Sequence, residues 1–156
     1  MLETRAHRRW FLAVVVGLPG TSVAAVRGDE VLYVGGTVPN LPEGTEGRVD
    51  LSNEDKMIFS SGKGGFEIPY RSITSLEYGQ KAGRRLGVAI TITIWALFSK
   101  KRKHFLTIGY TIGDKPQGVV LEIAKGRPKA VITVLETRSG RKVEYESQEA
   151  RKHVHG

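Results

Sequence analysis

The stretch KMIFSSGKGGFEIPYRSITSLEYG at residues 56–79 decides the fold class of this chain. It contains three short strand candidates. Apolar and polar residues alternate in Phe66–Ile68, and a period of two is typical of strands with one buried face. Glycines and a proline separate the runs, and these residue types mark turns. The strands predicted from this stretch are Lys56–Ser60, Phe66–Ile68 and Ile73–Tyr78.

The third of these runs does not keep a single register. Thr74, Leu76 and Tyr78 would share one face of the strand, whereas Ile73 would fall on the face opposite Leu76. One extra residue in a strand shifts its alternation in this way. We therefore predict a bulge or a short turn near Thr74.

Similar runs occur elsewhere along the chain. Isoleucine and threonine alternate within Val88–Phe98, and β-branched side chains fit the pleated surface of a sheet. One helix is expected between Pro128, which suits the first helical position, and Gly140, which suits the residue past the end. The polar residues 144–156 are predicted to form a mobile tail. The remaining predicted strands are Val31–Val34, Arg48–Leu51, Phe105–Tyr110 and Val119–Ile123.

Composition narrows the classes of function. The chain has 156 residues, of which 40% are hydrophobic, and this suits one domain with appendages. Its formal net charge of +8 favours anionic partners, although an excess of this size also serves solubility. The absence of cysteine excludes thiolate catalysis and cysteine-ligated zinc. Because no catalytic motif can be assigned, we predict a non-catalytic protein without cofactor or metal.

The first 25 residues have the organisation of an export signal. Three arginines precede the apolar run Trp10–Leu18, and small residues follow at positions 22–25. This run is shorter than the roughly 20 residues that span a bilayer. We therefore predict a signal peptide over residues 1–25 and an exported protein, periplasmic or secreted, with membrane association. The alternatives are an uncleaved anchor and a buried first element.

The order of these elements predicts a mainly β fold, a barrel or sandwich of about seven strands closed by one C-terminal helix. Four segments resemble the bacterial pleckstrin-homology-like and GRAM-type domains, in which a strand ending in Phe, an Ile-Pro-Tyr step and an "I..LE" strand recur in that order. They are GRVDLS at 47–52, MIF at 57–59, IPYRSI at 68–73 and LEYG at 76–79. The resemblance covers roughly residues 30–143 and implies a binding module for lipids, peptides or partner domains.

The candidate binding site is the segment from Lys81 to Phe105, which contains seven Lys and Arg residues and no acid. Its apolar middle would place two large aromatic side chains near the basic tip of a hairpin at residues 99–104. Tryptophan beside lysines suits contact with an anionic lipid surface. The candidate residues are Lys81, Arg84, Arg85, Trp95, Phe98, Lys100, Lys101, Arg102 and Lys103.

Other interpretations of this segment stay open. It also suits a core strand that ends in a solvated, charged turn protecting a sheet edge. An unknown protein could replace the lipid as partner, and the alternative function is a structural or assembly subunit that pairs through a sheet edge. Binding to nucleic acid is disfavoured because aromatic residues are not interleaved with the Lys and Arg residues, as a surface that stacks nucleobases would require. No small-molecule substrate is indicated.

The sequence alone assigns no functional role to the histidines of the predicted domain and tail. His153 and His155 lie in the predicted tail without a nearby carboxylate cluster, so we predict a solvated tail there rather than a metal site. His104 lies in the basic tip and is predicted to be a surface residue.

Overall fold

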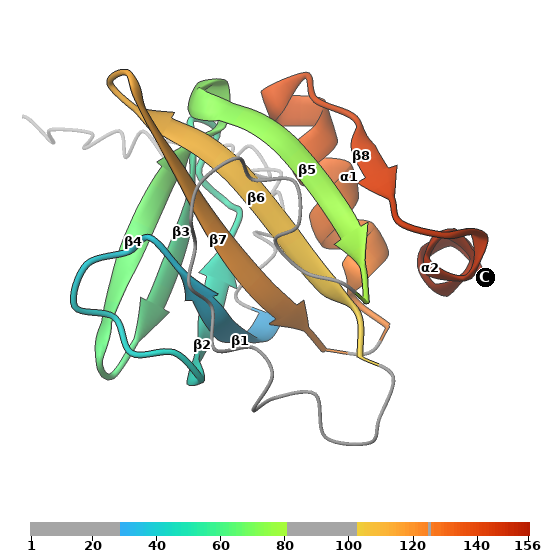
Figure 1. Cartoon of the computed structure of the whole chain (residues 1–156), viewed down its shortest axis with the longest axis horizontal. Coiled ribbons are helices and arrows are strands. Elements are labelled where there is room, and N and C mark those ends of the chain that lie inside the picture. Colours follow the sequence, from blue (N-terminus) through green and yellow to red (C-terminus); the bar gives the residue numbers. More distant parts are fainter. Residues whose placement is uncertain (1–28, 81–102, 125) are drawn as a thin grey trace, which may run out of the picture.

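The computed structural model describes residues 29–80, 103–124 and 126–156. Within these residues the fold is mainly β, with one eight-stranded sheet in the order β4-β3-β2-β1-β7-β6-β5-β8 and two short C-terminal helices (Figure 1). All neighbouring strands are antiparallel except β5 and β8, which are parallel. The strands are β1 (Asp29–Gly36), β2 (Thr45–Asp50), β3 (Lys56–Ser61), β4 (Gly64–Pro69), β5 (Ile73–Gly79), β6 (Phe105–Ile112), β7 (Lys115–Ile123) and β8 (Val143–Tyr145). The helices are η1 (Tyr70–Ser72, a 3-10 helix), α1 (Pro128–Ser139) and α2 (Gln148–His155).

Strands β1 to β4 form an antiparallel meander. The turn between β3 and β4 is tight, and the Ser61 hydroxyl donates to the carbonyl oxygen of Gly64 over 2.6 Å. Gly64 has φ +130°, a conformation that L side chains rarely adopt. Phe59 and Phe66 stack across the two strands with ring centroids 4.9 Å apart, so the turn and the aromatic pair fix the same register.

The bulge predicted near Thr74 is confirmed. The pairing of β5 with β6 shifts register between Ile73 and Ser75. The shift brings Ile73 onto the same buried side as Leu76 and Tyr78, while Thr74 and Ser75 are exposed. One extra residue therefore reconciles the two alternations that conflict in the sequence.

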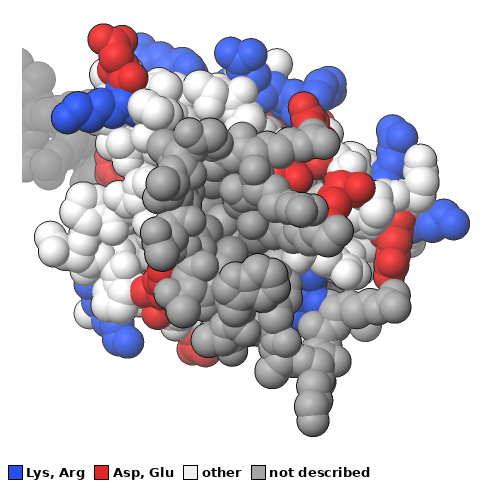
Figure 2. All heavy atoms as spheres, viewed as in Figure 1, with Lys and Arg blue, Asp and Glu red and all other residues white. Residues whose placement is uncertain are grey.

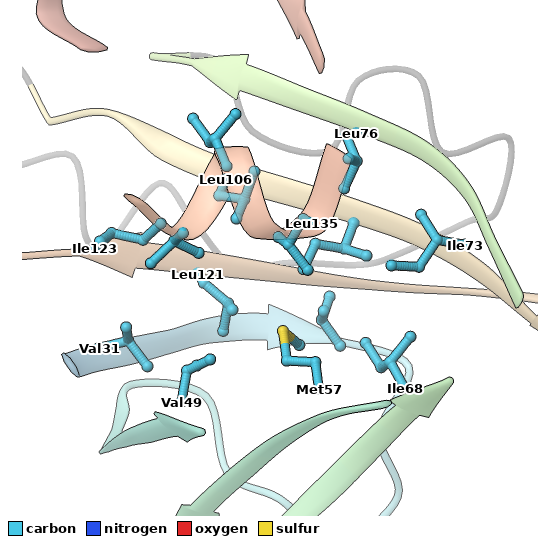
Figure 3. Packing of buried hydrophobic residues seen from close by; sticks show 14 of the residues in the cluster. Val31, Val49, Met57, Ile68, Ile73, Leu76, Leu106, Leu121, Ile123 and Leu135 are labelled. Atoms are coloured by element: carbon cyan, nitrogen blue, oxygen red, sulfur yellow. The ribbon is translucent and has the colours of Figure 1, made fainter. Parts of the chain in front are cut away.

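Helix α1 covers one face of the sheet and closes the main core (Figure 3). Val131, Ile132 and Leu135 are buried against strand residues such as Leu106 and Leu121. The predicted helix is confirmed at both ends, with proline at the first helical position and a left-handed glycine, φ +69°, at residue 140.

The structure corrects three details of the predicted fold. The sheet is open rather than closed into a barrel, because β4 and β8 lie at its opposite edges. A second helix, α2, follows α1, so the domain is not closed by one helix alone. The segment from Glu144 to Gly156, predicted as a tail, completes β8 and forms α2.

Packing explains why this polar segment is structured. The Ser147 hydroxyl accepts a hydrogen bond from the backbone N–H of Ala150 over 3.1 Å and caps α2. Ala150 and Val154, four residues apart, are buried in the main core cluster. Two small apolar side chains and a cap therefore contribute to the docking of α2.

Two of the predictions fall outside the described residues. The signal peptide predicted over residues 1–25 and the strand predicted at Val88–Phe98 both lie there. Within the described ranges, no helix has the length and apolar character needed to cross a bilayer.

Candidate functional site

The predicted basic site belongs to the connection between β5 and β6. Gly79 at the end of β5 pairs with Phe105 at the start of β6, so residues 80–104 leave and re-enter the sheet at neighbouring positions. Connections within hairpins usually have roughly two to five residues, and this one is much longer. Of the nine predicted site residues, the structure describes Lys103, and the other eight lie outside the described residues.

Lys103 is paired with an acid of the sheet. Its Nζ lies 2.9 Å from Oε2 of Glu122 on β7, and the two side chains are 34% and 26% exposed. The ion pair neutralises this base and holds the end of the connection to β7. Lys103 therefore contributes less free positive charge than the sequence alone suggests.

A small apolar cluster lies beside this ion pair. Val34, Phe105 and Val120 are buried together, and Leu32 packs against them. Side chains alternate along strands, so this cluster occupies the face of the sheet opposite the main core. The connection between β5 and β6 thus re-enters the sheet at an apolar position, since Phe105 is the first residue of β6.

Acidic residues border the same face. Glu46 on β2 and Glu122 on β7 are the two register partners of Leu32 on β1. Together with Glu30 and Arg48 they line an open groove of about 410 Å³. The sheet framework at this end is therefore acidic around an apolar centre.

Charge is divided unevenly between the framework and the connection. The described residues contain 13 Lys and Arg and 15 Asp and Glu, a net of −2, whereas residues 81–102 contain six Lys and Arg and no acid. Figure 2 shows acidic and basic side chains dispersed over the described part of one face. The basic character of the chain thus comes from segments other than the described framework.

Three rings from distant parts of the chain meet at the side of β5. His104 and His153 stack with ring centroids 4.2 Å apart and an interplanar angle of 14°. Tyr78 stacks on His104 with its centroid 5.7 Å away, and its hydroxyl lies 3.0 Å from Nδ1 of His153. His104 is thus a half-buried residue that packs against α2 rather than a surface residue of a loop tip.

Burial shifts the ionisation of this cluster. It raises the pKa of the Tyr78 phenol to about 12, with a smaller contribution from Tyr145. Burial also lowers the pKa of His104, and the neighbouring imidazole of His153 lowers it further. Glu149 and Glu146 act in the opposite direction with smaller effects. At neutral pH the cluster therefore favours an uncharged phenol and an uncharged His104 imidazole.

A second concave region lies between the end of α1, β8 and α2. This cleft has a volume of about 820 Å³. Its polar groups engage one another, since the Tyr145 hydroxyl lies 3.0 Å from Nε2 of His155 and Glu136 accepts from the backbone N–H of Val143. Among the residues that the structure describes, no three His, Asp or Glu side chains come together to hold a metal ion.

Sequence reasoning missed the cluster of Tyr78, His104 and His153. The hydrogen-bonded pair is 75 residues apart, and no spacing pattern joins a strand, a loop end and a C-terminal helix. The one available signal was the aromatic character of all three side chains. No protein-family model matches the chain, and no curated protein matches it in sequence.

Proposed function

We propose that this chain is an exported, non-catalytic binding module of the pleckstrin-homology-like type, and that it contacts an anionic membrane surface through residues 80–104. The order of a β-meander, a second set of strands and then helix α1 supports the fold assignment. The predicted export signal over residues 1–25 supports the location.

The separation of charge is the observation that carries this proposal. A framework with a net charge of −2 bears a connection with six bases and no acid between residues 81 and 102. Trp95 and Phe98 in the same connection add large amphipathic and apolar side chains. Bases near an anionic surface contribute about 1 kcal/mol each, and aromatic residues suit the interface between headgroups and acyl chains.

The attachment of the connection supports the same function. Its two ends join paired positions of the sheet, Gly79 and Phe105, and Phe105 is buried. The ion pair of Lys103 with Glu122 also attaches the connection to β7. A long segment held at both ends by a rigid sheet is a common arrangement of binding loops.

Co-sedimentation of the full chain with lipid vesicles tests the proposal. We expect binding to vesicles of phosphatidylcholine and phosphatidylglycerol, weaker binding at high salt, and little binding to phosphatidylcholine alone. The triple variant Lys100→Ser, Lys101→Ser, Arg102→Ser should lower the affinity by about 100-fold, since it removes roughly 3 kcal/mol of attraction.

A matched control separates a local site from general charge. The triple variant Lys63→Ser, Lys115→Ser, Lys129→Ser removes three exposed bases from the described framework. This control should keep most of the affinity for anionic vesicles. An equal loss in both triple variants, or no binding of the native chain at low salt, would overturn the proposed membrane contact.

The open sheet favours one second candidate, a subunit that assembles through a sheet edge. Strand β4 lies at one edge with six residues, and β8 at the other has three. Unpaired backbone groups of an edge strand can pair with another chain. A discrete oligomer in light scattering, together with no vesicle binding, would favour this candidate over the membrane contact.

A further inference from the structure

The position of α2 depends on contacts with the rest of the domain. It has eight residues, and a helix this short is not stable by itself in water. Its apolar anchors are Ala150 and Val154, both buried. His153 reaches Tyr78 on β5 and His104 before β6, and His155 and Arg151 contact Tyr145 on β8.

The stack formed by His104 and His153 is suited to uncharged rings. The two centroids are 4.2 Å apart, and Nε2 of His104 is buried without a hydrogen-bond partner among the described residues. Protonation of both rings would place two positive charges face to face, and like charges at this distance repel. Protonation of His104 would also leave a buried, charged N–H without an acceptor.

We propose that the stacked imidazoles of His104 and His153 form an acid-sensitive clasp, which holds α2 against β5 while His104 is neutral and releases it as His104 takes up a proton. The inference is independent of the proposed membrane contact, because it concerns the attachment of α2 and is measured without lipid.

Some of the charged and titratable groups around the clasp favour protonation of His104, and others oppose it. Tyr78 on β5 stays neutral, since burial raises its pKa to about 12. Glu146, which precedes α2, and Glu149 within it favour a protonated His104, but burial and His153 oppose them more strongly. The remaining groups on these elements are Glu77 on β5, Lys103 beside His104, Glu144 and Tyr145 on β8, and Arg151, Lys152 and His155 on α2.

The direction of the pH effect follows from the lowered pKa of His104. When the clasp is open, His104 regains the ordinary pKa of a solvated imidazole, near 6.5. The open state therefore binds more protons than the closed state as the pH falls through this value. Closure is complete above this range and is weakened below it.

Hydrogen exchange of the full chain measures release directly. Mass spectrometry follows the amides of residues 148–156 at about pH 7.5 and about pH 5.5, with correction for intrinsic exchange. We expect the protection of this segment to fall at the lower pH, while the amides of β6 keep their protection. The native chain losing no protection at the lower pH would overturn the clasp.

Two variants separate the clasp from other histidines. His104→Phe keeps an aromatic ring in the stack but cannot take up a proton, so the protection of α2 should become independent of pH. His155→Phe removes a histidine of the same helix that pairs with Tyr145 outside the stack, so the pH dependence should remain. The same pH dependence in the His104 variant as in the native chain would contradict the proposal.

A titration of the native chain keeps the test decisive if His104→Phe does not fold. Histidine side-chain resonances followed by NMR give the pKa of His104. The clasp requires a pKa of His104 below the ordinary value of 6.5, together with a change in the α2 signals as His104 titrates. A His104 that titrates like a free imidazole would overturn the clasp.

Discussion

Nη1 of Arg138 lies 2.6 Å from the carbonyl oxygen of Asn53, although 85 residues separate them. The same nitrogen contacts the carbonyl oxygen of Leu51 and lies 3.1 Å from the hydroxyl of Tyr70. One guanidinium nitrogen at the end of α1 therefore satisfies the backbone of the turn between β2 and β3. The side chain of Arg138 links the helix to the meander.

Replacement of Arg138 by Met should strongly destabilise the fold. The change leaves two partly buried carbonyl groups and a phenol without their donor, and the expected loss is about 2–4 kcal/mol of unfolding free energy. Urea denaturation measures it. Lys129→Met, at an exposed position near the start of the same helix, should stay within about 0.5 kcal/mol of the native chain. Equal effects of the two variants would contradict this role of Arg138.

Two isoleucines of β6 predict opposite responses to the same substitution. Ile108 is 0% exposed and belongs to the main core, whereas Ile112 is 64% exposed. Ile108→Ala should lower the unfolding free energy by about 2–5 kcal/mol because it leaves a cavity. Ile112→Ala should change it by about 0.5 kcal/mol or less. Denaturation midpoints compare the two variants. A loss of about 0.5 kcal/mol or less in Ile108→Ala would contradict the assignment of Ile108 to the main core.

The ion pair of Lys103 and Glu122 predicts a graded response within the basic site. Since Lys103 is paired with Glu122, removal of both charges in the double variant Lys103→Ser, Glu122→Gln should weaken vesicle binding less than Lys101→Ser does. Glu122→Gln should strengthen binding, because it releases the charge of Lys103 and removes an acid. Vesicle titrations at low salt measure all three. Weaker binding of the Glu122 variant would contradict the proposed contact.

The buried tyrosines predict a loss of stability at alkaline pH. Burial raises the pKa values of Tyr33 and Tyr78 to about 12, against about 10 in the unfolded chain. The unfolded state therefore releases protons first as the pH rises above 10, so the unfolding free energy should fall between about pH 10 and pH 12. Urea denaturation across this range measures the slope.

Substitution at Tyr33 checks that slope. Tyr33→Phe removes one of the phenols whose pKa burial raises, so the unfolding free energy should decline less steeply with pH in this variant. A slope equal to that of the native chain would show that Tyr33 ionises as easily when folded as when unfolded.

The sequence predicted the elements that local pattern alone can specify. Alternation and short apolar runs between turn residues located seven of the eight described strands, and the conflict between Ile73 and Leu76 located the bulge. Proline and glycine at residues 128 and 140 bounded α1. Each of these signals is contained within a few neighbouring residues, so it can be recognised without knowledge of the tertiary structure.

The parts that the sequence did not predict depend on distant contacts. Strand β8 has three residues and exists through its pairing with β5, while α2 depends on two small buried side chains and on the ring of His153. The ring cluster likewise joins a strand, a loop end and a helix. A polar composition hides such elements, because tertiary packing rather than local propensity stabilises them.

The parallel pairing of β5 with β8 gives the order of synthesis a role in folding. The backbone of β5 is translated about 65 residues before Val143, its partner on β8. Until that residue emerges, one side of β5 stays open to any other strand. A chain interrupted before Val143 would expose this edge and tend to associate, so fusion partners are better placed after residue 156 than inserted between α1 and β8.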